Sequence, residues 1–175
     1  MKIKIYTGIT LLMLLVFSCS VVDKLLTFTI SDEYTFTVPS GIPVGLPLSV
    51  TTPDISSSSS TEFQNNNTNA NLVKDVKLSK LQLTITEPTD KTFSFLKSIR
   101  IYISTDGTDE VELAYLDDIN VTTNKISLTT TNNKLDKYIK SSKYTLRIIA
   151  VTKETLTTAV KVKSNIEFKV TANPF

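Results

Sequence analysis

The chain contains no histidine and no tryptophan, and it has one cysteine and four glycines among its 175 residues. The lack of histidine excludes Ser-His-Asp and Cys-His catalysis, histidine general bases and histidine-ligated zinc. One cysteine cannot form an intramolecular disulfide, and four scattered glycines provide no glycine-rich phosphate loop. The lack of tryptophan removes the commonest side chain for stacking against sugars. These absences favour a protein that is not an enzyme.

The first nineteen residues contain the three parts of an export signal in the required order. Lys2 and Lys4 provide positive charge, and a mainly apolar run follows over residues 5–17. The run ends at Ser18 and at the only cysteine, Cys19. A positive start, an apolar core and a small residue at the cleavage site are typical of a secretory signal. The run is shorter than the roughly 20 residues that a membrane-spanning helix needs.

The end of this signal, Val16-Phe17-Ser18-Cys19, resembles the lipobox of bacterial lipoproteins of the Bacteroidota type. The resemblance implies that residues 1–18 are removed as a signal peptide and that the Cys19 thiol carries the lipid. Residues 19–24 would then be a lipidated tether to the domain of residues 25–175. We therefore expect a membrane-anchored protein of the cell envelope, with the outer membrane favoured over the inner one. Lipidation would also explain the lone cysteine of an exported protein.

The charges of the mature chain balance overall but are unevenly distributed. Without Lys2 and Lys4, 17 basic and 17 acidic residues remain, so there is no reason to expect nucleic acid as a partner. Residues 23–118 contain 14 acidic and 7 basic residues, whereas residues 119–175 contain 3 acidic and 10 basic residues. We expect the two segments to lie side by side and pair their charges. The alternative is a basic face that meets a partner.

Alternating patterns rich in Thr, Val, Ile, Phe and Tyr predict an all-β fold. About eight to nine strands separated by turns indicate an antiparallel, immunoglobulin-like β-sandwich, with a small β-barrel as the alternative. In residues 72–86 the apolar positions change phase at Ser79-Lys80, as a β-bulge would cause. Asp106-Gly107 predicts the turn of a hairpin between residues 93–105 and 110–116.

Four segments deviate from simple alternating strands. Residues 42–50 place Pro or Gly between apolar residues, which predicts an edge strand or an extended strap. Residues 53–71 are rich in Ser and Asn, so we expect a flexible loop. Residues 133–141 predict the one short helix, and Asp32-Glu33 predicts a hairpin turn. All of these belong to one expected β-sandwich domain.

Acidic side chains cluster at the predicted hairpin turn. Asp106, Asp109 and Glu110 are weak candidates for calcium ligands, but their spacing lacks the alternating oxygens of a calcium loop. We therefore expect a solvated turn with neither metal nor cofactor. A hydrolase that uses only carboxylates would need two of them facing each other across a cleft, which the spacing does not predict.

Four lysines lie on or beside the predicted helix and are a candidate basic face for a partner: Lys134, Lys137, Lys140 and Lys143. A solvated helix face is the simpler interpretation. The sequence thus predicts a non-enzymatic envelope lipoprotein whose β-sandwich serves protein interaction or structural assembly. We expect it to hold no cofactor. Its expected partners are the membrane, through the lipid anchor, and another envelope protein. The alternative is a surface lipoprotein that binds a ligand or glycan through tyrosines and amides.

Overall fold

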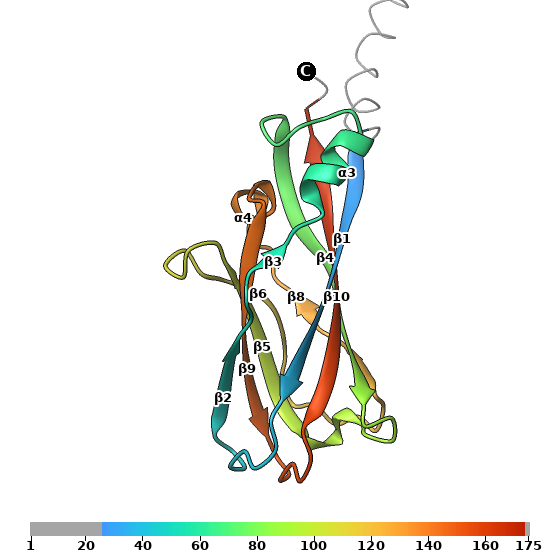
Figure 1. The fold of residues 1–175 in the computed structure, drawn as a ribbon, viewed down its shortest axis with the longest axis vertical. Helices are drawn as coiled ribbons and strands as arrows, with labels where there is room; N and C mark the ends of the chain where they lie inside the picture. The colour runs from blue at the N-terminus through green and yellow to red at the C-terminus, as the bar shows by residue number, and fades with distance from the viewer. Residues whose placement is uncertain (1–25, 174–175) are drawn as a thin grey trace, which may run out of the picture.

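The computed structural model describes residues 26–173, whose strands form two antiparallel sheets packed face to face (Figure 1). The four-stranded sheet has the order β1-β10-β4-β7. The six-stranded sheet has the order β2-β9-β5-β6-β8, with β3 also paired to β9. Within the described residues the sheets do not close into a barrel. The predicted antiparallel β-sandwich is therefore confirmed.

The strands account for most of the described chain, and the helical elements are short. The elements in chain order are β1 (Thr27–Val38), β2 (Pro47–Thr51), β3 (Ile55–Ser56), α3 (Ser59–Asn65), β4 (Val73–Glu87), η1 (Phe93–Phe95), β5 (Leu96–Ser104), β6 (Val111–Leu116), β7 (Lys125–Ser127), β8 (Thr129–Thr130), α4 (Asp136–Lys140), β9 (Lys143–Thr152) and β10 (Val160–Ala172). Among residues 26–173, no helix is long and apolar enough to cross a bilayer.

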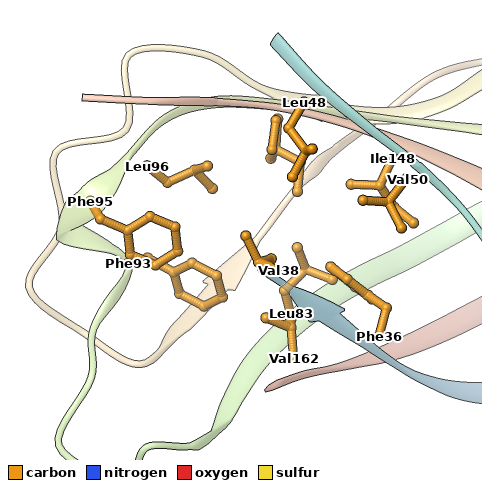
Figure 2. Close-up of a pocket in the computed structure, with 12 residues that line it drawn as sticks. Phe36, Val38, Leu48, Val50, Leu83, Phe93, Phe95, Leu96, Ile148 and Val162 are labelled. Carbon is orange, nitrogen blue, oxygen red and sulfur yellow. The ribbon is translucent and has the colours of Figure 1, made fainter. Parts of the chain in front are cut away.

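The core lies between the two sheets because successive strand residues point to opposite faces. Phe168 on β10 is fully buried and meets Tyr144 on β9 edge to face, with ring centroids 6.3 Å apart. This contact joins the two sheets. At one end of the sandwich the core leaves an apolar crevice of about 20 Å³ between β1 and β2, which is space for about one water (Figure 2).

Three features expected from the strand patterns are confirmed. Phe168 pairs with Leu78 while Glu167 pairs with Lys80, so Ser79 is the bulged residue of β4. β5 and β6 form the predicted hairpin. The edge strand or extended strap expected over residues 42–50 is confirmed only from Pro47, where β2 begins at the edge of its sheet, and residues 42–46 form no strand. The difference is at residues 93–95, which form the 3₁₀ turn η1 instead of the start of β5.

The predicted turn at Asp32-Glu33 is wrong, because β1 pairs with β10 at every residue from Thr27 to Val38. The Asp32 carboxylate points into the core and accepts hydrogen bonds from the Tyr144 hydroxyl (2.9 Å), the Ser58 backbone N–H (3.0 Å) and the Ser58 hydroxyl (2.7 Å). A buried polar group with such partners is tolerated in a strand. Burial and then the neighbouring Asp32 carboxylate raise the pKa of Tyr144 well above its ordinary value.

The Ser/Asn-rich segment 53–71, expected as a flexible loop, contains β3 and α3. Its two large apolar side chains, Ile55 and Phe63, are buried. The Phe63 ring packs edge to face on Phe28 of β1, with centroids 6.1 Å apart. These two anchors order the segment although its composition is polar. α4 lies within the predicted helix of residues 133–141, so the described chain has two α-helices where we expected one.

Tyr144→Phe tests the buried contact between the sheets. The variant keeps the ring but removes one donor from the Asp32 carboxylate, which is expected to lower the free energy of unfolding by about 1.5–3 kcal/mol. Urea unfolding measures this change. Tyr34→Phe is the matched control, because the Tyr34 hydroxyl makes no hydrogen bond within residues 26–173, and it should change stability by less than about 0.5 kcal/mol. Equal effects of the two variants would contradict a role for the Tyr144 hydroxyl.

Candidate functional site

The outer face of the six-stranded sheet carries both arginines of the chain beside two tyrosines. Arg100 and Tyr102 lie on β5, Tyr115 on β6 and Arg147 on β9; we call these four residues the Arg/Tyr face. Strand register places Arg100 opposite Tyr115 and Tyr102 opposite Arg147. Each side chain is half-buried, because the alternate residues of these strands point into the core.

Each arginine of this face stacks on a tyrosine. The guanidinium carbon of Arg147 lies 4.6 Å from the ring centroid of Tyr102, and that of Arg100 lies 5.3 Å from the centroid of Tyr115. These are cation–π distances. These contacts hold both guanidinium groups beside the tyrosine rings of the same sheet face.

Carboxylates also form hydrogen bonds and ion pairs with the same two arginines. Arg147 donates from Nε to Glu110 at 2.7 Å and from Nη2 to the second carboxylate oxygen. Arg100 pairs with Glu112 at 2.8 Å and with Asp117 at 2.9 Å. The hydrogen bonds from Arg147 lower the pKa of Glu110, so the pair stays ionised at neutral pH. The face is therefore preorganised before any partner binds.

Two aliphatic residues extend the Arg/Tyr face along β9. Ile149 and Val151 share the outer side of that strand with Arg147 and are half-buried. Ile149 lies opposite Arg100 on one side and Ser49 on the other. Tyrosine and arginine side chains are enriched at the centre of protein interfaces, and the two aliphatic residues add apolar surface beside them.

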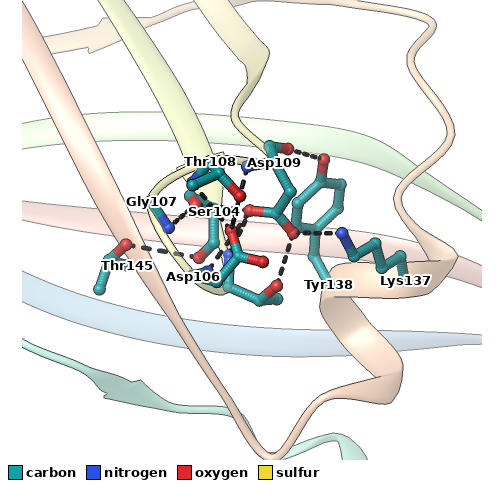
Figure 3. Close-up of polar contacts among 9 residues, drawn as sticks. Ser104, Asp106, Gly107, Thr108, Asp109, Lys137, Tyr138 and Thr145 are labelled. Atoms are coloured by element: carbon teal, nitrogen blue, oxygen red, sulfur yellow. Dashed lines mark hydrogen bonds and ion pairs between the residues drawn. The ribbon is translucent and has the colours of Figure 1, made fainter.

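The loop of residues 104–110, at one end of this face, is built around the Asp109 carboxylate (Figure 3). Asp109 accepts hydrogen bonds from the Ser104 hydroxyl (2.6 Å) and from the Thr105 backbone N–H (2.8 Å) and hydroxyl (2.5 Å). Lys137 of α4 lies 2.7 Å away. Burial alone would raise the pKa of Asp109, but the hydrogen bonds from Lys137, Ser104 and Thr105 hold it well below its usual range.

Asp106 closes the turn in the same loop. Its carboxylate accepts hydrogen bonds from the Thr108 backbone N–H and hydroxyl, both at 2.8 Å. Gly107 follows with φ +81°, a conformation that favours glycine. Asp106, Asp109 and Glu110 are thus each directed at protein donors and not at a common point. Within residues 26–173, no three His, Cys, Asp or Glu side chains are grouped to hold a metal ion.

The structure places the four candidate lysines in different environments. Lys137 lies on α4 and pairs with Asp109, while Lys143 begins β9 and pairs with Asp54. Lys134 and Lys140 are exposed and have no ion pair within the described residues. The four lysines therefore do not form one uncompensated basic face.

The acidic and basic segments of the sequence do pair, as the charge distribution predicts. Five ion pairs join a basic residue after position 118 to an acidic residue before it: Lys137–Asp109, Lys143–Asp54, Arg147–Glu110, Lys161–Glu87 and Lys163–Glu33. Cys19 and residues 1–24, on which the predictions of lipidation and export rest, lie outside the described residues.

A polar hollow of about 310 Å³ opens between the Arg/Tyr face and the loop of residues 104–110. Its lining consists of Thr51, Ser104, Gly107, Glu110, Thr145 and Arg147. Neither this hollow nor the Arg/Tyr face was expected from the sequence. The sequence does show that Arg100 and Tyr102 alternate with the isoleucines of β5, which places both on the outer side of one strand. The strand order, which the sequence does not show, brings Arg147 and Tyr115 beside them.

The chain matches no protein-family model and no curated protein. Among solved structures it is similar to FLHE, with 10% identity over 84% of this chain and 98% of that chain and a TM-score of 0.34. It is similar to the decameric BFDV capsid protein, with 11% identity over 82% and 98% and a TM-score of 0.35. A structure of carbohydrate-binding modules of the β-sandwich superfamily matches with 12% identity over 84% of this chain and 55% of that chain, at a TM-score of 0.28.

Proposed function

We propose that this protein is a non-enzymatic lipoprotein of the cell envelope, anchored through Cys19, that binds a protein partner through the Arg/Tyr face. The observation that carries the proposal is the pairing of both arginines with tyrosines on one outer sheet face. Tyrosine and arginine dominate the binding energy of many interfaces, and rigid side chains lose little entropy on binding. The lipobox-like end of the signal supports the location in the envelope.

The chemistry of the described side chains supports a binding role over catalysis. The sequence has no histidine, and its cysteine is assigned to lipidation. The carboxylates beside the Arg/Tyr face are engaged with Arg100 or Arg147. None of these groups is left as a free general base, so the face is suited to recognition.

Site-directed photo-crosslinking in cells tests the proposed interface. A photoreactive amino acid at Ser49, exposed beside Ile149, should give a crosslinked protein in the membrane fraction. Tyr102→Ala should reduce the crosslink about tenfold or more, because a central aromatic anchor contributes roughly 2 kcal/mol or more to binding. Mass spectrometry identifies the captured protein.

Two controls make this result specific. The same photoreactive residue at Thr84 lies on the outer face of the other sheet, opposite Lys163, and should give no such product. Tyr102→Phe keeps the ring under Arg147 and should retain the crosslink. The proposal fails if Ser49 gives no product, or if Tyr102→Ala folds normally and crosslinks as well as the unchanged protein.

The polar hollow supports a second candidate function, capture of a glycan or another small polar ligand. Its lining combines the Thr51 and Thr145 hydroxyls with the Glu110–Arg147 pair, which are groups that bind sugar hydroxyls. The Nη1 group of Arg147 is not used in the pair with Glu110. Saturation-transfer NMR with mono- and disaccharides tests this function, and Thr145→Val should abolish any signal that arises in the hollow.

A further inference from the structure

We propose that a row of lysines on the four-stranded sheet, next to the start of β1, lies against the acidic headgroups of the membrane that holds the protein. The lysine row consists of Lys169 on β10, Lys77 on β4 and Lys134 just before α4. This inference rests on the proposed lipid anchor at Cys19, but it does not involve the Arg/Tyr face. Its occupant is a lipid surface, whereas the Arg/Tyr face is proposed to bind a protein.

The lysine row crosses the sheet at one level, perpendicular to the strands. Strand register places Thr29 of β1 opposite Lys169, and Lys169 opposite Lys77. The Lys77 ammonium donates a hydrogen bond to the Asn132 carbonyl at 2.5 Å, two residues before Lys134. The helix α4, which follows Lys134, packs against β4. Three lysines from separate parts of the chain are thus brought to the same level of the sheet.

Lys77 and Lys169 form a like-charge pair directly across two strands. Residues opposite each other in an antiparallel pair have Cβ atoms about 4.5–5.5 Å apart, where like charges are destabilising. None of the three lysines of the row has an ion pair within residues 26–173. Farther along the same face of β10 the situation differs, because Lys163 pairs with Glu33. Anions lying over the row would relieve the repulsion between Lys77 and Lys169.

The elements around the row leave this end of the protein positive. Lysines without an ion pair in the described chain lie here on or next to β4, α4 and β10: Lys74, Lys77, Lys134, Lys140 and Lys169. Carboxylates without one lie on α3, β4 and α4: Glu62, Asp75 and Asp136. Two positive charges therefore remain in excess. The other charged groups of this end are in ion pairs, Lys80–Glu167 and Lys137–Asp109.

The proposed anchor brings the row close to the bilayer. Leu26 is the seventh residue after Cys19, so the connection between them spans at most roughly 25 Å. β1 begins and β10 ends at the same end of the sandwich (Figure 1). Lys169 lies three residues before the end of β10 at Ala172, a rise of about 10 Å. Electrostatic attraction extends a further Debye length of about 8 Å at physiological salt, so the row is within reach of charged headgroups.

The composition of this surface favours lipid over protein as its occupant. The outward residues beside the row on β1 and β10 are polar and include Thr29, Ser31 and Thr171. Lysine is depleted at protein interfaces, which instead concentrate aromatic and apolar side chains. A row of lysines without an apolar neighbour has only charge to offer, and acidic lipid headgroups are the anionic surface nearest to an anchored chain.

Acetylation footprinting of the acylated protein in lipid vesicles tests this contact. One set of vesicles contains phosphatidylglycerol in phosphatidylcholine, and the other contains phosphatidylcholine alone. Mass spectrometry should show that acetylation of Lys134 and Lys169 slows about threefold or more with phosphatidylglycerol, and that salt at about 1 M removes this protection by screening. Lys125 is the internal control. It is exposed on β7 in register with Lys163, roughly 20 Å along the sheet from Lys169, and its acetylation rate should be equal in both vesicles.

A charge-matched pair of variants makes the test specific. Lys77→Gln combined with Lys169→Gln should remove the protection of Lys134. Lys97→Gln combined with Lys125→Gln removes the same charge from exposed lysines outside the row and should leave that protection unchanged.

Three results would overturn the inference: equal acetylation in the two kinds of vesicle, protection of Lys125 as strong as that of Lys169, or protection that survives the Lys77 and Lys169 substitutions. If urea unfolding shows that this double variant does not fold, the comparison of vesicles with the unchanged protein still decides. Intact mass is measured first. An unmodified Cys19 would overturn the anchor and this inference together, whereas an acylated protein without protection would overturn this inference alone.

Discussion

Replacing Cys19 with alanine is expected to move the protein from the membrane fraction to the soluble envelope fraction almost completely. The change removes the Cys19 thiol, which we propose is acylated because it ends the lipobox-like Val16-Phe17-Ser18-Cys19. Each buried methylene of an acyl chain contributes about 0.8 kcal/mol to membrane binding, so several chains hold a protein durably. Membrane fractionation and intact-mass spectrometry of the N-terminus measure the effect.

Ser20→Ala is the matched control for this prediction, because it changes the next residue and leaves the thiol. It should keep both the acylated mass and the membrane location. An unmodified Cys19 in the unchanged protein, or a chain that retains Met1, would contradict the lipoprotein assignment. The proposed location in the envelope would be withdrawn with it, whereas the recognition surfaces of residues 26–173 would still be open to test in vitro.

Asp109→Ala is expected to lower the free energy of unfolding by about 2–3 kcal/mol. The substitution leaves the Ser104 hydroxyl and the Thr105 backbone N–H without their acceptor in a partly buried loop, and such unsatisfied donors cost about 1–3 kcal/mol each before water compensates. Urea unfolding at neutral pH measures the loss. Asp90→Ala is the control, because the exposed Asp90 carboxylate makes no hydrogen bond within the described residues.

The pH dependence of stability provides an independent test of the same carboxylate. The pKa of Asp109 is lower in the folded protein than in the unfolded chain, where it is about 3.9. The stabilisation that the ionised Asp109 carboxylate provides is therefore complete above the unfolded pKa. It is lost as the pH falls from there toward the folded pKa. The unchanged protein should lose stability between about pH 5 and pH 2, and Asp109→Asn should lose less over this range. If the unchanged protein and Asp109→Asn lost the same stability over this pH range, the role of Asp109 would be contradicted.

A lysine variant separates the ion pair from the loop hydrogen bonds. Lys137→Gln removes the salt bridge to Asp109, but the Lys137 side chain is 60% exposed. An exposed ion-pair partner contributes little to stability because solvent screens it. We therefore expect Lys137→Gln to have a free energy of unfolding close to that of the unchanged protein. A loss as large as that of Asp109→Ala would mean that the salt bridge, and not the loop hydrogen bonds, stabilises this turn.

Local sequence patterns were sufficient for several parts of the fold because their causes are local. Alternating apolar residues specify which strand face is buried, and one inserted residue at Ser79 reverses that facing wherever the strand pairs. Proline at position 47 restricts its strand to an edge because proline has no backbone donor. The predicted export signal is likewise a local pattern.

Other features depended on contacts between residues far apart in the chain. Asp32 lies in a strand and not in a turn because Ser58 and Tyr144 supply its hydrogen bonds from other elements. Residues 53–71 are rich in Ser and Asn, but burial of the two apolar side chains Ile55 and Phe63 orders the segment. In both cases tertiary partners outweigh local propensity.

The sequence alone determined that this chain is rich in alternating strands and that it lacks histidine chemistry. It also predicts an export-type signal before the lone cysteine. Only the tertiary structure decided that Arg147 stacks on Tyr102, 45 residues earlier in the chain, and that β1 lies at the edge of its sheet beside β10. The physical reason is that residue spacing specifies the face of a strand but not its neighbours. Neighbours follow from strand order, which the packing of the whole core selects.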